Sequence, residues 1–152
     1  MENASKALIM AGGVLIGILI LSLAAYLFVD LGSTSAEITA QNAQKQITEF
    51  NSKFTSYEEY KDSDGNWQIT IYDIISLAAY AKENNEYYKD VEDEKISVKI
   101  DNQEIQDNDS AQNEKLIKKY INEDGTLVKF KCDNIDYNSR GKVKIIVFKA
   151  VA

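Results

Sequence analysis

The sequence predicts an α+β protein in which a long amino-terminal helix precedes a small antiparallel sheet with short helices. Three observations lead to this prediction. Residues 7–29 are uncharged and almost entirely apolar, and residues 36–57 place apolar side chains at helical spacing. Residues 95–151 contain segments in which apolar and polar side chains alternate, as strands require. We therefore divide the chain into a tail and transmembrane helix (1–29), an amphipathic stalk (30–57) and an α+β domain (58–152).

The first element is a membrane-spanning helix. In residues 7–29 the sole polar side chain is Ser22. About 23 residues of helix reach roughly 35 Å, enough to cross the ~30 Å hydrocarbon core of a bilayer. A cleaved signal peptide is the alternative, since small residues occur at 23–25 and 34–36. We favour a retained anchor, because the apolar part of a signal peptide is usually only about 7–15 residues long.

Basic residues on the flanks predict the orientation of this helix. Lys6 precedes the apolar segment, whereas Asp30 and Glu37 follow it, and the next basic residue is Lys45. Lysine and arginine are retained on the cytoplasmic side of a membrane. We therefore expect a single-pass membrane protein with a cytoplasmic amino terminus and an extracytoplasmic or cell-surface carboxy-terminal domain.

Two glycines in the apolar segment form a candidate helix-packing face. Gly13 and Gly17 make a GxxxG pattern, which allows two helix backbones to approach closely in lipid. The alternative is that these glycines reflect only the high frequency of glycine in membrane helices. If the pattern is functional, the expected partner is a second copy of the chain or another membrane subunit.

The stalk carries an apolar stripe that requires a partner. Its residues are spaced by three or four positions and form our candidate interface: Ile47, Phe50, Phe54 and Tyr57. An isolated amphipathic helix is only marginally stable in water, so we expect the stripe to pack against the following domain, and in part against neighbouring copies. Residues 32–35 (GSTS) are poor helix formers and could kink the chain before the stripe.

The remaining elements follow from capping, turn and alternation signals. Thr70 and Asp73 fit a capping box that opens a helix ending near residues 84–85. The other expected elements are a strand at 95–100, a short return strand at 104–106, a polar loop at 107–113, a helix at 114–122, and strands at 126–137 and 142–151. No internal repeat stands out.

Composition argues against an enzyme and against nucleic-acid binding. The chain has no histidine, which is the commonest general base, and none of the common nucleophile, phosphate-binding or dinucleotide-binding motifs. A net charge of −7 is opposite to the basic surface that nucleic acids require. The acidic runs at 90–94 and 107–109 are expected to be solvated loops. We therefore predict no catalytic residues and no cofactor.

Residues 62–73 do not fit a calcium-binding loop. Asp62, Asp64 and Asn66 resemble the start of such a loop, but an EF-hand requires glycine at its sixth position and glutamate at its twelfth. Here Gly65 is fourth and Asp73 is twelfth, so we predict no metal site.

Two further residue types leave open alternatives. The single cysteine, Cys132, cannot form an intrachain disulfide, so we expect a buried thiol, with intermolecular pairing as the alternative. The nine tyrosines, including the pair Tyr87 and Tyr88, suit either the edges of a core or a contact surface.

This order of elements resembles type IV pilins and pseudopilins. In that family the apolar half of the long helix anchors the subunit in the membrane and later forms the filament core. Family precursors are typically cut after a glycine, and bacterial subunits usually carry glutamate five residues further on; cutting after Gly13 would place Ile18 there. The resemblance implies a structural subunit of a surface filament or secretion apparatus. The alternative is a monomeric, membrane-anchored binding module.

Overall fold

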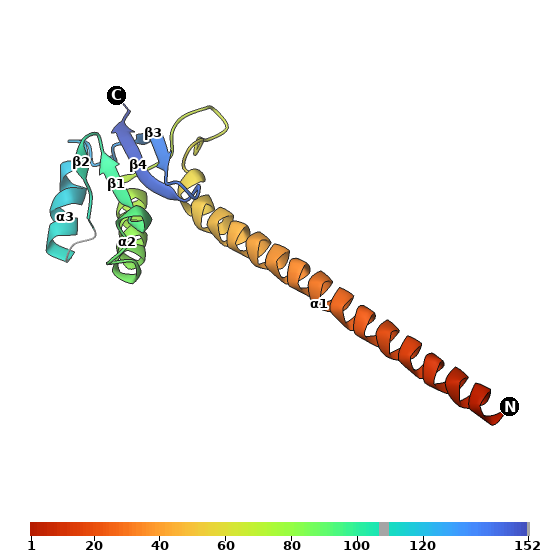
Figure 1. Ribbon diagram of the computed structural model, residues 1–152. Coiled ribbons are helices and arrows are strands. Elements are labelled where there is room, and N and C mark those ends of the chain that lie inside the picture. The colour runs from red at the N-terminus through yellow and green to blue at the C-terminus, as the bar shows by residue number, and fades with distance from the viewer. Residues whose placement is uncertain (107–109, 152) are drawn as a thin grey trace. The chain divides into compact units, whose positions relative to one another are not determined.

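A computed structural model describes residues 1–106 and 110–151 (Figure 1). The chain divides into two compact units, Met1–Lys45 and Gln46–Ala152, which we call the stem unit and the head unit. One helix, α1 (Glu2–Thr55), supplies the whole stem unit and the first turns of the head unit.

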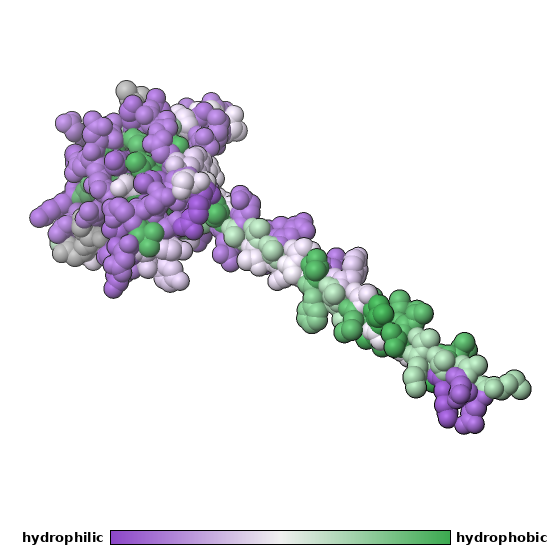
Figure 2. All heavy atoms as spheres, viewed as in Figure 1, coloured by the Kyte–Doolittle hydropathy of each residue, from purple (hydrophilic) through white to green (hydrophobic). Residues whose placement is uncertain are grey.

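The stem unit is an exposed helix with an apolar segment. By length and composition α1 could cross a membrane: its most apolar window has a mean hydropathy of 2.6 and is 0% buried. Apolar side chains gather along this part of the helix in Figure 2. The weak helix formers at residues 32–35 do not interrupt α1. The Ser33 hydroxyl donates to the Asp30 carbonyl and the Thr39 hydroxyl donates to the Ser35 carbonyl, both at 2.9 Å. Because these hydroxyls act as donors within the helix, they do not draw the backbone N–H groups away from their helical hydrogen bonds.

The head unit is built on a four-stranded sheet, which confirms the predicted α+β class. Its strands are β1 (Ser97–Ile100), β2 (Gln103–Glu104), β3 (Phe130–Tyr137) and β4 (Val143–Ala150), in the order β2-β1-β4-β3. The pairs β1–β2 and β3–β4 are antiparallel, as expected, whereas β1 and β4 are parallel. The sheet is mixed because the long connection after β2, which contains α3 (Ser110–Lys119), returns the chain so that β4 runs in the direction of β1.

Several element boundaries differ from the predicted ones. The helix α2 (Ile71–Tyr87) is longer than expected and is followed by the short 3-10 helix η1 (Glu92–Glu94). Helix α3 begins at Ser110, inside the expected polar loop, whose residues 107–109 lie outside the described part of the chain. Polar residues there can be helical because α3 buries only one face, with Leu116 and Ile117 against the core.

The core lies between the helices and the sheet. The capping box predicted for α2 is present: the Asp73 carboxylate accepts hydrogen bonds from the backbone N–H and the hydroxyl of Thr70, both at 2.8 Å. Helix α1 contributes Phe54, α2 contributes one apolar face, and the sheet contributes alternate side chains. The largest fully buried residues are Phe54, Phe130, Phe148, Ile69, Ile71, Ile74, Ile146, Val98 and Val143.

Two matched hairpins form an internal repeat, although no internal repeat was predicted from the sequence. Residues 60–68 and 120–128 share the pattern Tyr-x-Asp/Asn-x-Asp-Gly, and each follows a helix, α1 after a turn at residues 56–59 and α3 directly. Their bridges correspond, Lys61 with Trp67 and Ile121 with Leu127, and so do their backbone hydrogen bonds. The repeat is visible in the sequence only when the two Asp-Gly pairs are aligned, because the residues around them differ.

The two hairpin glycines are predicted to be required for stability. Gly65 and Gly125 have φ of +83° and +84°, and nothing lies within 4 Å of a Cβ added to either. Alanine at either position should lower the free energy of unfolding by about 1–2 kcal/mol, entirely through backbone strain. Urea unfolding followed by the fluorescence of Trp67 measures this loss. Gly32→Ala in helix α1 is the control, and an equal loss there would contradict the prediction.

Candidate functional site

The two candidate packing glycines lie on the open surface of α1. A Cβ added to Gly13 or Gly17 meets no atom within 4 Å, so this face of the stem unit is available to a partner helix. Neighbouring apolar side chains are exposed as well, among them Val14 and Ile18, at 63% and 59%. The helix-packing role of the glycines stays a prediction.

The predicted interface stripe joins α1 to the head. Phe54 is fully buried, and its ring lies 6.0 Å from that of Tyr80 on α2. Phe50 and Tyr57 are partly buried against the same core, with Phe50 at 5.7 Å from Tyr80. Packing against the following domain is therefore confirmed for Phe50, Phe54 and Tyr57, whereas Ile47 is not among the residues packed against the core. Contact with neighbouring copies stays a prediction, and it can involve only the exposed parts of Ile47, Phe50 and Tyr57.

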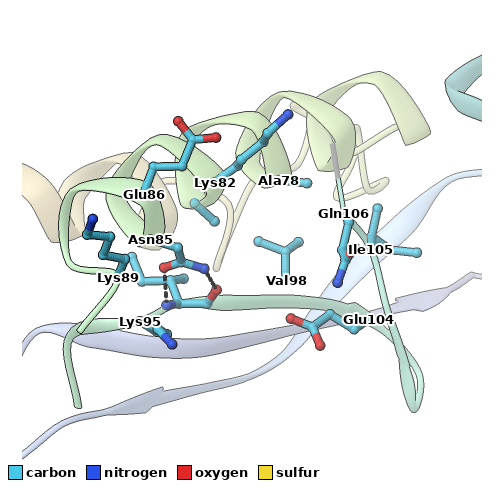
Figure 3. A pocket seen from close by; sticks show the side chains of 12 residues that line it. Ala78, Lys82, Asn85, Glu86, Lys89, Lys95, Val98, Glu104, Ile105 and Gln106 are labelled. Carbon is cyan, nitrogen blue, oxygen red and sulfur yellow. Dashed lines mark hydrogen bonds between the residues drawn. The ribbon is translucent and has the colours of Figure 1, made fainter. Parts of the chain in front are cut away.

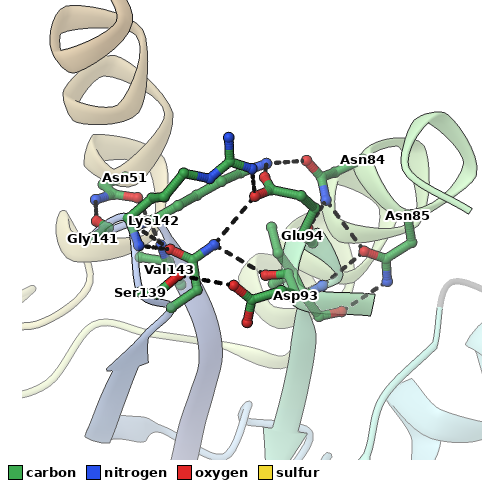
Figure 4. Close-up of polar contacts among 12 residues, drawn as sticks. Asn51, Asn84, Asn85, Asp93, Glu94, Ser139, Gly141, Lys142 and Val143 are labelled. Carbon is green, nitrogen blue, oxygen red and sulfur yellow. Dashed lines mark hydrogen bonds and ion pairs between the residues drawn. The ribbon is translucent and has the colours of Figure 1, made fainter. Parts of the chain in front are cut away.

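A side-chain amide fixes the end of α1 to the turn between β3 and β4. The Asn51 Nδ2 donates to the Gly141 carbonyl at 2.7 Å, and the Val143 N–H donates to Asn51 Oδ1 at 2.9 Å (Figure 4). One side chain thus satisfies a donor and an acceptor of the turn, as a neighbouring strand would. These contacts join residues about 90 positions apart and set where the helix enters the head unit.

A buried charged pair lies beside this contact. The Lys142 ammonium is 3.2 Å from Glu94 Oε2 and donates to Asn84 Oδ1 at 2.8 Å, and both charged side chains are less than 10% exposed. The second Glu94 oxygen accepts from Arg140. Burial, and then the Arg140 guanidinium, lower the pKa of Lys142. The ammonium also lies over the Phe50 ring at 4.3 Å, so the pair holds α1, α2 and β4 together.

The burial of Glu94 corrects the expectation that residues 90–94 are a solvated acidic loop. Glu94 is 4% exposed, while Glu92 and Asp93 are exposed. Nothing in the local sequence distinguishes Glu94 from its acidic neighbours. Its partner Lys142 is 48 residues away, so tertiary folding alone selects this carboxylate for burial.

A groove of about 440 Å³ lies between α2 and the β1–β2 hairpin (Figure 3). Its floor is apolar, and its rim carries charges of both signs. The lining residues are Ala78, Ala81, Ile96, Val98 and Ile105 on the floor, with Lys82, Asn85, Glu86, Lys89, Lys95, Glu104 and Gln106 around them. The Ile96 N–H donates to Asn85 Oδ1 at 2.7 Å, and Asn85 Nδ2 donates to the Ile96 carbonyl at 2.8 Å, so α2 is fixed to the residue that precedes β1.

The acidic residues of the two hairpins act as backbone caps. The Asp62 carboxylate accepts from the N–H groups of Asp64 and Asn66, both at 2.9 Å, and Asp124 accepts from Thr126. These hydrogen bonds lower the pKa of both carboxyls, chiefly through Asn66 at Asp62. Their stabilisation is present at neutral pH and is lost as the pH falls through the lowered values. Within residues 1–106 and 110–151, no group of three metal-binding side chains occurs.

The single thiol is predicted to react slowly. Cys132 is half-buried on β3, and burial, followed by the charges of Glu58 and Asp133, raises its pKa to about 11 from 9.0. At pH 8 its thiolate fraction is therefore about 100-fold below that of an unperturbed thiol. We expect iodoacetamide to modify the folded protein about 100-fold more slowly than the protein unfolded in guanidinium, as measured by intact mass. Rates within about fivefold would contradict this prediction.

Comparisons of the chain with protein-family models, with curated proteins and with solved structures find no match.

Proposed function

We propose that this protein is a structural subunit of a pilin-like surface filament or secretion apparatus, anchored by a single transmembrane helix. One observation carries the proposal: α1 is a continuous helix of 54 residues. None of its most apolar window is buried, while its last turns are part of the head core. An apolar helix surface without a partner in its own chain suits lipid before assembly and other copies of the same helix afterwards.

The proposed topology places the amino terminus in the cytoplasm and the head unit outside the membrane. Lys6 stands before the apolar segment and pairs with Glu2 at 3.0 Å, and acidic residues follow the segment. In this arrangement the head units would cover the surface of the assembly, and the apolar helices would form its centre.

Cross-linking in the native membrane tests the proposal. The double variant Gly13→Ile, Gly17→Ile places two branched side chains on the proposed contact face and should abolish cross-linked oligomers. The matched control is Leu15→Ile, Leu19→Ile, which keeps side-chain volume on the opposite face of the helix and should leave the oligomers unchanged. Oligomers that survive the glycine substitutions would overturn assembly through this face.

The second candidate function is a monomeric, membrane-anchored binding module. The groove between α2 and the β1–β2 hairpin favours it, because an apolar floor with a polar rim is the usual form of a ligand site. A binding module should retain its ligand in a strictly monomeric state, whereas a filament subunit should be recovered as oligomers from membranes treated with cross-linker.

A further inference from the structure

A second groove on the head unit has a different chemistry. It lies where the end of α2 meets Phe50 of α1 and has a volume of about 440 Å³. Its lining residues are aromatic, acidic or amide-bearing: Phe50, Tyr80, Tyr87, Tyr88, Glu83, Glu86 and Asn84. None of them is basic. We call it the aromatic–acidic groove.

The two carboxylates of this groove form no ion pair with the described residues. Glu83 and Glu86 are exposed on α2, and neither forms an ion pair with any residue in the described ranges, 1–106 and 110–151. Tyr87 is 80% exposed and meets the ring of Tyr88 edge-on, with the ring centroids 4.8 Å apart. The groove therefore presents an open aromatic face beside two exposed carboxylates that form no ion pair in the described residues.

The protein's own lysines show what the rings of this groove bind. The Lys53 ammonium lies 3.9 Å from the centroid of Tyr80, and the Lys142 ammonium lies 4.3 and 4.4 Å from the centroids of Phe50 and Tyr88. Three of the four rings thus already hold a cation. Among the described residues, no ammonium or guanidinium lies over the fourth ring, Tyr87.

We propose that the aromatic–acidic groove is an interaction surface for a basic segment of a partner protein, with a lysine or arginine side chain on Tyr87 between Glu83 and Glu86. Arginine is the better fit, because its planar guanidinium stacks on a ring and bonds a carboxylate at the same time. This inference is independent of assembly through Gly13 and Gly17, since all of its residues belong to the head unit.

Binding of a short peptide to the full chain in non-ionic detergent micelles tests this proposal. The probe is acetyl-Gly-Arg-Arg-Gly-amide, the comparison peptide carries Gln-Gln in place of Arg-Arg, and calorimetry measures both. We expect the arginine peptide to bind at least 10-fold more tightly than the glutamine peptide, with an affinity that falls as salt is added. Equal binding of the two peptides, or no binding at millimolar concentration, would overturn the proposal.

Variants then locate the bound peptide. Glu83→Gln with Glu86→Gln should weaken the arginine peptide at least 10-fold, while Glu58→Gln with Glu59→Gln should not change it. Tyr87→Leu should weaken it by about 2- to 30-fold, whereas Tyr87→Phe, which keeps the ring, should not. Tyr72→Leu, at another exposed tyrosine of α2, is the matched control. Unchanged binding in the Glu83 and Glu86 variant refutes the assignment.

A competing occupant of the same chemistry is a quaternary ammonium headgroup. Tetramethylammonium chloride added to the same titration distinguishes it from a peptide. If tetramethylammonium displaces the arginine peptide at equal concentration, the groove is a general cation site and the proposed protein partner is overturned. If sodium and tetramethylammonium displace the arginine peptide equally weakly, the assignment of the groove to a basic protein segment stands.

Discussion

Replacing Phe54 with alanine is expected to lower the free energy of unfolding of the head unit by about 3–5 kcal/mol. The Phe54 side chain is 0% exposed and forms a cluster with the rings of Phe50 and Tyr80, at 5.5 and 6.0 Å. Removing it opens a cavity where α1, α2 and the sheet meet, and helices on either side cannot collapse into that space without losing other contacts. Denaturant unfolding of the full chain in micelles, followed by the fluorescence of Trp67, measures the loss.

The same helix supplies the control for this substitution. Phe28 is 78% exposed on the stem unit, so Phe28→Ala should leave the unfolding of the head unchanged. Phe54→Leu should cost less than Phe54→Ala because it restores part of the lost volume. An alanine variant as stable as the parent protein would show that the end of α1 is not part of the cooperative head.

Replacing Lys142 with methionine is expected to lower the free energy of unfolding by about 3 kcal/mol, because it leaves a buried carboxylate with one partner fewer. Glu94 is 4% exposed and is held by Lys142 at 3.2 Å and by Arg140. Methionine keeps the length and apolar character of the lysine stem and can still pack on Phe50. The loss therefore reports the missing charge and not a missing volume. Thermal and denaturant unfolding of the full chain both measure it.

An exposed ion pair two residues further along, at the start of β4, provides the control. Lys144 lies 3.0 Å from Asp93, but these side chains are 40% and 50% exposed. Lys144→Met should therefore change the stability by less than about 1 kcal/mol. Equal losses at Lys144 and Lys142 would contradict the assignment of the large effect to burial. Each single change, Lys142→Met or Glu94→Gln, leaves the other buried charge without its partner. The double variant removes both charges, so its loss of stability should be smaller than the sum of the two single losses.

Local signals in the sequence predicted the elements well where each element carries its own signal. The apolar segment 7–29 lies in a helix, the capping box at Thr70 opens α2, and alternation in 143–150 forms β4. The prediction was less accurate at positions whose conformation depends on distant partners. Residues 126–129 were expected to begin a strand, yet residues 126–128 belong to the second hairpin, and β3 begins at Phe130, where pairing with Ala150 begins.

The grooves and the buried pair could not be predicted from the sequence. Glu94 and Lys142 each stand among similar charged residues, and only the pairing of β4 with β1, together with the position of α2, brings them into contact. The aromatic–acidic groove likewise needs Phe50 of α1 beside residues 80–88 of α2. Tyr87 and Tyr88 were noted as either core edges or contact surface, and the structure leaves Tyr88 half-buried and Tyr87 exposed.

By itself the sequence determined that the chain begins with a long helix able to span a membrane, and that an α+β head follows. These properties depend on hydropathy and on contacts within a few residues, which the order of side chains fixes directly. Only the tertiary structure decided that β1 and β4 are parallel, that Glu94 is buried, and which faces of α1 and α2 meet. Those outcomes depend on contacts between residues about 25–90 positions apart, whose free energy arises only after the chain has closed the intervening loops.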